Sequence, residues 1–484
     1  MTEKQRVRTR IAPSPTGMPH IGTFRTIVFN WLLARHHGGQ FVVRIEDTDV
    51  ARRVEGAVEA ILDGLRWLGL DWDEGPEVGG PHAPYLQSQR LPIYREHAER
   101  LLAQGHAYRC FCSPERLAAM REEQQRRREP PGYDRLCRTL SESEVREKLD
   151  LGLVPVIRFK VPLEGTTTFH DLIHGDITFP NAALDDFVLI KSDGYPTYHL
   201  ANVVDDHLME ISHVMRADEW ISSTPRHVLL YRAFGWEPPR FAHVPQILGP
   251  DRSKLSKRHG ATSVLAYRDM GYLPEAMLNY LALLGWAYDA TTEIMSRDDL
   301  IRYFSIEKIN KTGAIFDVTK LDWMNGYYIR QLSVPDLTSR VMPYLKAAGL
   351  ATERDRDYVE RIVPLLQERI RKLSEVVELA DFFFLDGLDY DSHLLVAKGL
   401  SAEASLRALR VARERMEGLV EWDRATLEGT LRPLAEELGV KTGQLFGILR
   451  VAVTGKTAAP PLFETMEVLG RDRVMARLAD AEER

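Results

Sequence analysis

The sequence predicts an α/β front half built on a parallel sheet, followed by an all-α C-terminal half. Three observations support this prediction. Strand-like and helix-like segments alternate near the N-terminus, strand signals fade beyond residue 262, and leucines recur at helical spacing in the C-terminal tail. With 484 residues, of which 44% are hydrophobic and 27% charged, the chain can form roughly two to four globular domains.

The N-terminal segment has the pattern of a strand, a loop, a helix and a second strand. Residues 6–12 alternate as a strand does, and the proline- and glycine-rich residues 13–17 interrupt them. Residues 23–36 carry apolar side chains at helical spacing, two glycines end this helix, and residues 41–45 form a short apolar strand. This βαβ unit predicts a Rossmann-like, doubly wound parallel sheet with its ligand at the carboxyl ends of the strands.

The middle of the chain predicts an interrupted sheet and then helices. Short strands are expected at residues 187–190 and 211–215, with a helix over residues 225–234. Further helices are expected over residues 273–284 and 316–329. The long gap between the first strands and the later ones indicates that an α+β insertion interrupts the sheet.

The C-terminal tail is expected to be helical throughout, because its leucines fall on single helix faces at spacings of three and four. One such face carries Leu427, Leu431, Leu434 and Leu438, and the next carries Leu445, Ile448, Leu449 and Ala452. We therefore divide the chain into a parallel-sheet domain (residues 1–100 and 191–260), an insertion (101–190), a helical domain (261–334) and a second helical domain (335–484).

Composition excludes several classes of protein. No stretch approaches the roughly 18 to 20 uninterrupted apolar residues that span a bilayer, and the basic N-terminus lacks the apolar core of a secretory signal. Three cysteines cannot build a disulfide framework in so long a chain, so we expect a reducing, cytoplasmic location. A formal net charge of −7 excludes a basic coat but leaves room for a local basic surface that binds nucleic acid.

The first chemical motif lies at the junction between the first predicted strand and the first predicted helix. His20, Gly22 and Thr23 stand at the start of that helix. Its unpaired backbone N–H groups and positive dipole end suit a phosphate, the glycine lets a nucleotide approach closely, and the histidine can donate to phosphate oxygens. Taken alone, an HxG sequence is more often a helix cap beside an incidental surface histidine.

The second motif is a basic loop that contains Lys254, Ser256 and Lys257. Such a loop can close over a triphosphate and neutralise the charge that develops on departing pyrophosphate. Alone it is more often a solvated basic turn. An HxG element at the first strand–helix junction, followed some 230 residues later by a KxSK loop, is the two-part signature of class I aminoacyl-tRNA synthetases.

The whole chain closely resembles the bacterial-type glutamyl-tRNA synthetases. Thr23 departs from the general class I pattern, in which many members have a second histidine, although the glutamate enzymes tolerate this change. The stretches that carry the resemblance are Arg10-Ile-Ala-Pro-Ser-Pro-Thr-Gly, Val43-Arg-Ile-Glu-Asp-Thr-Asp49, Leu65-Arg-Trp-Leu-Gly-Leu70, the run from Ser192 to His207, Met215-Arg-Ala-Asp-Glu-Trp220 and Leu321-Asp-Trp-Met-Asn-Gly326.

The resemblance implies a glutamate–tRNA ligase. Such an enzyme activates L-glutamate with ATP and Mg²⁺ to glutamyl-adenylate, and it then transfers the glutamyl group to the terminal ribose of tRNA(Glu). It implies a catalytic domain in the front half, an insertion that binds the acceptor stem, a stem-contact domain over residues 261–334 and an anticodon-binding domain over residues 335–484. We expect a monomer without a membrane partner.

Site residues follow from the same resemblance, position by position. A guanidinium donates two parallel hydrogen bonds to a carboxylate, which suits arginine to a substrate with two carboxylates. Glutamate would be held by Arg10 and Arg216 at its carboxylates, by Glu46 at its ammonium, and by Ala12, Ser14, Tyr198 and Asn202 as supporting contacts. The nucleotide would contact His20, Gly22, Thr23, Glu219, Trp220, Ile247, Lys254, Ser256 and Lys257, of which His20, Gly22, Lys254 and Lys257 serve catalysis.

All three cysteines, Cys110, Cys112 and Cys137, fall within 28 residues. Clustered thiolates near a glycine–proline turn are typical of a structural Zn²⁺ site, and a small insertion gains most from such a clip. Three reduced, partly buried cysteines are the alternative. Family members with zinc here use Cys-x-Cys and then Tyr-x-x-x-Cys, so Tyr133 or water would be the fourth ligand. Thr139 stands where some members place a histidine.

Two arginine-rich runs are candidates for RNA contact. One lies in the insertion and the other near residue 370, although either could be a solvated helix face. By resemblance, Arg369 falls where discriminating members contact the third anticodon base, which favours tRNA(Glu) over tRNA(Gln). The candidates are Arg121, Arg126, Arg127, Arg128, Arg135 and Arg138 in the insertion, and Arg369, Arg371 and Lys372 in the tail.

Several other functions are alternatives. An enzyme that charges both tRNA(Glu) and tRNA(Gln) shares every motif. A tRNA-modifying glutamyl transferase lacks the helical tail, and another nucleotidyltransferase of this superfamily would not need RNA. A non-enzymatic RNA-binding protein leaves His20, Glu46, Arg216 and Lys257 without a role. A redox role for the cysteines has no Cys-x-x-Cys spacing to support it.

Overall fold

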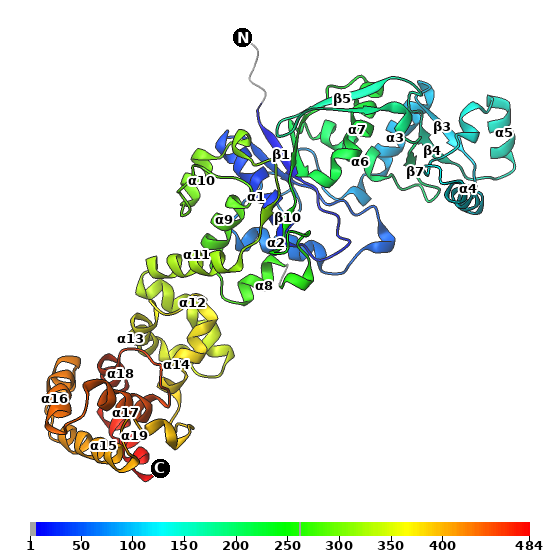
Figure 1. Cartoon of the computed structure of the whole chain (residues 1–484). Helices are drawn as coiled ribbons and strands as arrows, with labels where there is room; N and C mark the ends of the chain where they lie inside the picture. The colour runs from blue at the N-terminus through cyan, green and yellow to red at the C-terminus, as the bar shows by residue number, and fades with distance from the viewer. Residues whose placement is uncertain (1–5, 261–262) are drawn as a thin grey trace. The chain divides into compact units, whose positions relative to one another are not determined.

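The computed structural model describes residues 6–260 and 263–484, except for the side chain of Lys257. It contains two compact units (Figure 1). The first unit comprises Met1–Tyr267 and Met277–Asp317, and the second comprises Arg268–Ala276 and Val318–Arg484. The expected α/β front half and all-α C-terminal half are confirmed.

The first unit is organised around parallel strands. β1 (Arg8–Ile11) pairs in parallel with β2 (Gln40–Val43), and β8 (His213–Ala217) pairs in parallel with β9 (Arg240–Val244). β8 lies beside β1, where the N–H of Ser212 donates to the carbonyl of Arg8. The strands therefore form the expected Rossmann-like sheet, in which β8 lies next to β1.

Helix α1 (Ile21–His36) connects β1 to β2 and is buried along nearly its whole length. It follows the loop at residues 13–17 and stops where Gly38 adopts a left-handed conformation at φ 59°, which suits a residue without a Cβ. A helix covered on almost every side needs few polar positions, so its apolar periodicity is weak. The other helices of this region are α2 (Ala57–Trp67), α3 (Leu91–Ala103), α6 (Tyr198–Leu208) and α7 (Thr224–Phe234).

The insertion forms a small antiparallel sheet and a long hairpin. The strand expected at residues 187–190 is present as β7 (Val188–Ile190), and it pairs antiparallel with β4 (Val156–Phe159), which pairs with β3 (Ala107–Cys110). The hairpin consists of β5 (Thr166–Asp171) and β6 (Gly175–Pro180). Helices α4 (Pro114–Arg127) and α5 (Glu142–Asp150) complete this region.

The insertion is joined to the parallel sheet by hydrogen-bonded strands. β5 lies beside β9 in parallel, with Asp171 opposite Phe241, so the order across this sheet is β6-β5-β9-β8. The remaining elements of the first unit are β10 (Ile247–Leu248), α10 (Arg297–Tyr303) and β11 (Ala314–Ile315). Helices α8 (Val264–Asp269) and α9 (Pro274–Leu283) each contribute residues to both units.

The second unit is all helical over its described residues and has one core. As the leucine spacing predicted, Leu427, Leu431 and Leu434 are buried together with Leu445, Ile448 and Leu449. Among the described helices, none combines the length and apolarity that crossing a membrane requires. The α-helices that lie wholly in the second unit are α11 (Val318–Gln331), α12 (Val334–Ala347), α13 (Arg356–Leu366), α14 (Val376–Phe384), α15 (Ala402–Glu417), α16 (Arg424–Glu437), α17 (Thr442–Thr454), α18 (Leu462–Leu469) and α19 (Arg471–Glu483).

Candidate active site

A cavity of about 870 Å³ opens at the carboxyl ends of β1, β2 and β8, where a doubly wound sheet binds its ligand. It brings together residues that the sequence places more than 200 positions apart. The predicted glutamate and nucleotide residues along its wall are Arg10, Ala12, Ser14, His20, Gly22, Thr23, Glu46, Tyr198, Asn202, Arg216, Glu219, Trp220, Ile247 and Lys254. Ser256 is not among the lining residues, and the side chain of Lys257 lies outside the described structure.

His20 caps the N-terminus of α1. Its Nδ1 accepts from the N–H of Gly22 at 3.0 Å, so its proton sits on Nε2, where it can donate to a ligand. Desolvation and the nearby Lys254 ammonium lower the pKa of His20, which keeps the imidazole neutral near pH 7. A Cβ built on Gly22 would come within 2.8 Å of this ring. A larger residue at position 22 would therefore displace the histidine as well as narrow the approach to the helix end.

The basic loop meets the opposite wall of the cavity. Lys254 Nζ lies 2.7 Å from Glu219 Oε2, and both side chains are largely exposed. The ring of Trp220, beside that glutamate, packs against the ring of Tyr198 in a tilted arrangement, with the ring centroids 4.6 Å apart. Ile247 is buried in β10 behind the loop. An exposed ion pair is worth little, so a triphosphate can replace Glu219 as the partner of Lys254 at small cost.

The two predicted carboxylate-binding arginines differ in how their charge is balanced. Arg10 donates to both oxygens of Asp206, at 3.1 and 3.2 Å, and both side chains are buried. Arg216 is buried as well, at 6% exposure, but no carboxylate among the described residues pairs with it. Its hydrogen-bond partners are neutral groups of Tyr198, His243, Thr224 and Trp220.

A buried cation without an anion is costly, and it is retained where a ligand supplies the missing charge. Arg216 therefore marks the place where the cavity favours a carboxylate. Arg10, whose charge Asp206 already balances, can still offer the hydrogen bonds that Asp206 leaves free. The sequence placed both arginines at the carboxylates of glutamate without showing how the charge of each is balanced.

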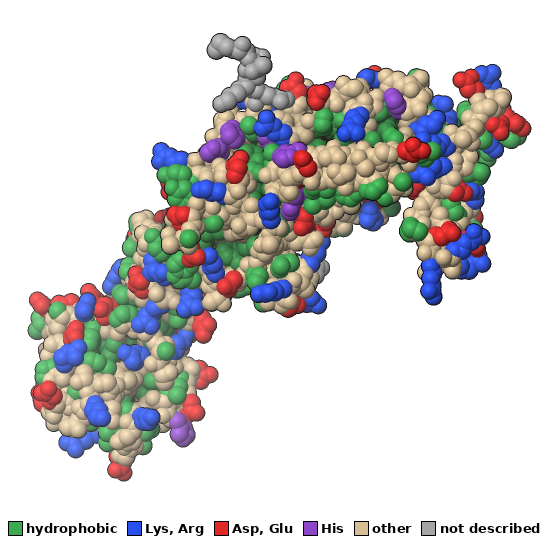
Figure 2. Space-filling model, turned by 45° about the horizontal axis from the view of Figure 1, so that its top comes forward, with side chains coloured by type: hydrophobic (Ala, Val, Ile, Leu, Met, Phe, Trp, Pro, Cys, Tyr) green, Lys and Arg blue, Asp and Glu red, His purple; other side chains and the backbone are tan. Residues whose placement is uncertain are grey.

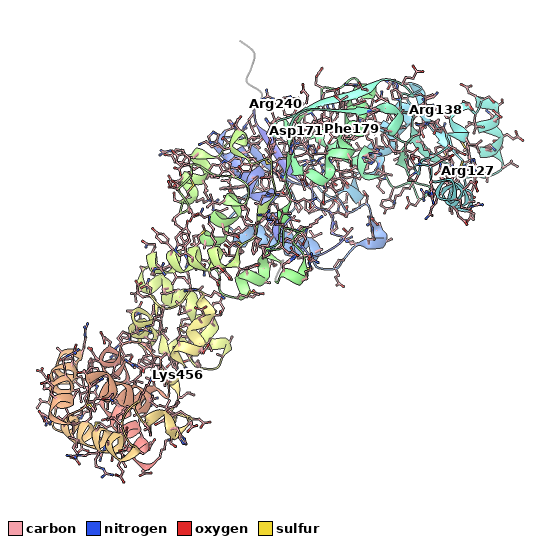
Figure 3. All side chains as sticks on the ribbon, in the orientation of Figure 1. Arg127, Arg138, Asp171, Phe179, Arg240 and Lys456 are labelled. Carbon is pink, nitrogen blue, oxygen red and sulfur yellow. The ribbon has the colours of Figure 1, made fainter. Side chains whose placement is uncertain are left out.

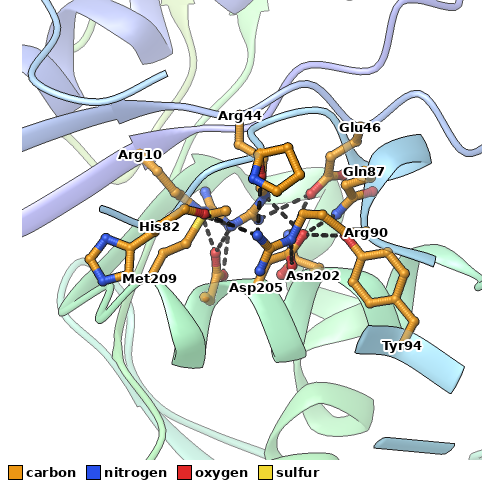
Figure 4. A network of polar contacts seen from close by, with 12 residues as sticks. Arg10, Arg44, Glu46, His82, Gln87, Arg90, Tyr94, Asn202, Asp205 and Met209 are labelled. Atoms are coloured by element: carbon orange, nitrogen blue, oxygen red, sulfur yellow. Dashed lines mark hydrogen bonds and ion pairs between the residues drawn. The ribbon is translucent and has the colours of Figure 1, made fainter. Parts of the chain in front are cut away.

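Glu46 is the complementary anion in the cavity. Its Oε1 accepts from Asn202 at 3.0 Å and from Arg44 at 3.2 Å (Figure 4). Burial raises the pKa of Glu46, and the Arg44 guanidinium and the Asn202 amide offset part of that rise. An ammonium group bound beside Glu46 would compensate its charge.

Behind these residues lies a buried network that the sequence analysis did not predict. Arg44 is fully buried and contacts Asp206 at 2.8 Å and Asp205 at 3.7 Å, as well as Glu46. Asp205 in turn accepts from Arg90, Gln87 and Tyr94 at 2.7 to 2.9 Å (Figure 4). The network thus ties the floor of the cavity to α3 and α6. Two adjacent aspartates, directly after Val203 and Val204 on α6, were the available signal.

The three cysteines form one cluster in the insertion. The Sγ atoms of Cys110, Cys112 and Cys137 lie within 4.8 Å of one another. The hydroxyl of Tyr133 lies 3.3 Å from the Sγ atoms of both Cys110 and Cys112. Tetrahedral zinc with roughly 2.3 Å bonds to sulfur separates its thiolates by about 3.7 Å, and Cys112 and Cys137 are 3.6 Å apart. The predicted ligand set therefore fits Zn²⁺.

The arginines of the insertion divide into two kinds. Arg135 and Arg138 both pair with the buried Asp186, so these two serve the fold. Figure 3 labels Arg138. Arg126 and Arg127 pair with the exposed Glu123 and stay largely exposed. Acidic and basic side chains are intermixed over the face seen in Figure 2, so this face carries no basic coat.

Comparison with known protein families shows the family to which the chain belongs. Residues 6–323 match the family described as "tRNA synthetases class I (E and Q), catalytic domain", and residues 336–482 match "Anticodon binding domain". The chain belongs to the class I tRNA synthetases of the E and Q type. This confirms the relationship that the sequence motifs predicted.

Relatives of this synthetase chain are similar over almost their full length. A glutamate–tRNA ligase of Dehalococcoides mccartyi is 59% identical over 98% of this chain and 97% of its own length. One from Moorella thermoacetica is 50% identical over the same shares. Among solved structures, a glutamate–tRNA ligase from Elizabethkingia meningosepticum in complex with its amino acid superposes with a TM-score of 0.91 at 36% identity, covering 99% of both chains.

Proposed function

We propose that this chain ligates L-glutamate to tRNA(Glu), with ATP as the energy source. The observation that carries the proposal is a single cavity beside the HxG helix start. There Arg216, a buried cation that pairs with no carboxylate of the described residues, faces the same space as a buried anion, Glu46. Glutamate presents an ammonium and two carboxylates, so it balances both. The similarity to glutamate–tRNA ligases of other bacteria supports the same reaction.

The first step needs positioning and charge stabilisation rather than a protein nucleophile. A substrate carboxylate oxygen attacks the α-phosphorus of ATP, forming the C–O–P bond of glutamyl-adenylate while the bond to pyrophosphate breaks. His20 donates from Nε2 to the nucleotide phosphates, and Lys254 neutralises charge on the leaving group. In the second step, a hydroxyl of the terminal ribose attacks the acyl carbonyl, and AMP leaves.

Mg²⁺ would accompany ATP and screen the charge of its phosphates. We propose Ser256 and Lys257 as further contacts of the closing loop, and Glu219 and Trp220 as contacts on the nucleoside side. For the Cys110, Cys112, Cys137 and Tyr133 cluster we propose a structural Zn²⁺, which would clip β3 to the segment around Cys137.

The anticodon domain supports tRNA as the acceptor substrate. We propose that the exposed arginines of the insertion approach the acceptor stem and that Arg369 approaches the anticodon. Three cysteines without a disulfide suit the cytoplasm, where tRNA is charged.

Aminoacylation of purified tRNAs tests the proposal. Wild-type protein is incubated with ATP, Mg²⁺ and labelled glutamate, and with tRNA(Glu) or tRNA(Gln), in zinc-supplemented and zinc-free buffer. We expect glutamate to be attached to tRNA(Glu) with release of AMP and pyrophosphate. A protein that forms no glutamyl-tRNA with either acceptor would contradict it. Equal charging of both tRNAs would support the second candidate, a non-discriminating ligase.

A further inference from the structure

We infer that Asp171 and His243 position Arg216, and that this buried relay sets the preference of the cavity for an acidic side chain. The inference rests on the proposed function, because it concerns how the glutamate-binding arginine is held. Neither residue lines the cavity, and both are fully buried.

The contacts run in a line from the insertion to the cavity. Asp171 Oδ2 lies 2.6 Å from His243 Nδ1, and His243 Nε2 lies 3.1 Å from the Nε of Arg216. Thr224 Oγ1 contacts the same Nε2 at 3.1 Å and also accepts from Arg216 Nη2 at 2.9 Å. Figure 3 marks Asp171 on the ribbon. The imidazole is therefore held at both nitrogens.

The hydrogen bonds fix which nitrogen of His243 carries the proton. Asp171 accepts from the backbone N–H groups of Ile173, His174 and His243, so its carboxylate is stabilised as an anion. Although burial opposes ionisation, these bonds and the His243 imidazole hold the pKa of Asp171 below its usual value. An anionic acceptor at Nδ1 places the proton there and leaves a lone pair on Nε2. Arg216 has only donors, so it requires that lone pair.

The relay crosses three neighbouring strands. Asp171 ends β5, His243 lies on β9, and Arg216 lies directly opposite His243 in the parallel register of β8. A rigid sheet therefore sets the distance between the two charges. β5 joins this sheet at a single paired position, Asp171 opposite Phe241.

The relay also explains how a buried cation can remain available to substrate. A carboxylate in direct contact with Arg216 would occupy its hydrogen bonds, as Asp206 does for Arg10. A neutral imidazole between Asp171 and Arg216 keeps the negative charge near enough to offset burial but out of contact. Tyr198 accepts from Nη1 at 2.6 Å, so neutral groups orient the guanidinium on both sides.

Four variants test the inference by the KM for glutamate in aminoacylation. In Asp171→Asn the side-chain amide donates a hydrogen bond to His243 Nδ1, so the imidazole proton moves to Nε2. The N–H at Nε2 then faces the N–H of Arg216 Nε, and neither can accept from the other. His243→Leu removes the acceptor, whereas His243→Gln restores an acceptor oxygen near the position of Nε2. His174→Ala is the control, because His174 contacts the backbone of His243 but not Arg216.

We expect the KM for glutamate to rise about tenfold or more in Asp171→Asn and His243→Leu. The KM values for ATP and tRNA should stay within about twofold, and His243→Gln should recover much of the loss. A glutamate KM within twofold of wild type in both His243 variants would overturn the inference, as would a parallel rise in the KM for ATP. Absence of glutamylation by the wild-type protein would instead remove the proposed function, so the two failures are distinguishable.

Discussion

The charged residues around the cavity have separate tasks because their charges are balanced in different ways. Asp206 receives hydrogen bonds from two buried guanidinia, Arg10 and Arg44. Burial opposes its ionisation, yet these two cations hold the pKa of Asp206 below its usual value. The aspartate therefore stays charged and fixes the geometry of the cavity floor. The charge of Arg216, in contrast, would be balanced by a carboxylate of the bound ligand.

Replacing Asp206 should destabilise the fold. Asp206→Asn takes the paired carboxylate from the buried Arg10 and one of three carboxylates from the buried Arg44, and breaking a buried pair costs about 3–5 kcal/mol. We expect the free energy of unfolding, measured by urea denaturation, to fall by that amount. Glu99→Gln is the matched control, because Glu99 pairs with Arg109 at the surface and should cost less than about 1 kcal/mol. Equal effects of the two substitutions would contradict the role given to Asp206.

Replacing Arg216 should abolish activity but have little effect on the stability of the fold. Arg216→Ala removes a buried cation that pairs with no anion in the part of the chain that the structure describes, so the fold should survive while glutamate activation is lost. We expect pyrophosphate exchange in the presence of tRNA to fall below detection. The rise in melting temperature that glutamate produces in the wild type should also disappear. Arg232→Ala, an exposed arginine on α7, should leave both measurements unchanged. Exchange near the wild-type rate in Arg216→Ala would refute the pocket assignment.

At the scale of elements, the local patterns were predictable and the pairings were not. The strand and helix at residues 6–36 follow from alternation and a glycine stop, so β1 and α1 appear close to where they were expected. The pairing of β5 with β9 joins residues 70 positions apart and has no local signature. Arg10, Glu46 and Arg216 lie in sequence motifs, so their roles could be predicted. The roles of Asp206 and His243 depend on tertiary contacts, which no local pattern indicates.

The cysteine cluster joins elements that are short and weakly packed. Cys110 ends β3, Cys137 lies in the single turn Leu136–Thr139, and α4 and α5 bury no residue completely. Such a region has little apolar core of its own, so a metal would contribute much of its stability.

We expect about one zinc per chain in protein purified without chelator. Cys137→Ser should abolish zinc binding, and Tyr133→Phe should weaken it about tenfold or more, measured by competition with a chromogenic chelator. Tyr108→Phe is the control, since the Tyr108 hydroxyl bonds to Asp186 and not to a thiol. Zinc far below one per chain in the wild type would remove the metal site. Full affinity in Tyr133→Phe would instead assign water as the fourth ligand.

At the scale of the whole molecule, the chemistry and the expected anticodon contact fall in different compact units. The cavity belongs entirely to the first unit, and the segment after α13 belongs to the second. There Arg369 is exposed, and its backbone N–H donates to the carbonyl of Leu366. Changes at Arg369 should therefore alter the choice of tRNA without touching the amino-acid site.

Arg369→Ala should relax discrimination between the two tRNAs. Loss of one hydrogen-bonded base contact costs about 1–3 kcal/mol, so we expect the ratio of kcat/KM for tRNA(Glu) to that for tRNA(Gln) to fall about tenfold. The KM for glutamate, measured with tRNA(Glu) at saturation, should not change, because Arg369 lies outside the unit that holds the cavity. Arg407→Ala, an exposed arginine on α15, should leave the ratio at its wild-type value. An unaltered ratio in Arg369→Ala would mean that other residues of the helical unit distinguish the anticodons, whereas a raised KM for glutamate would place this arginine in communication with the cavity.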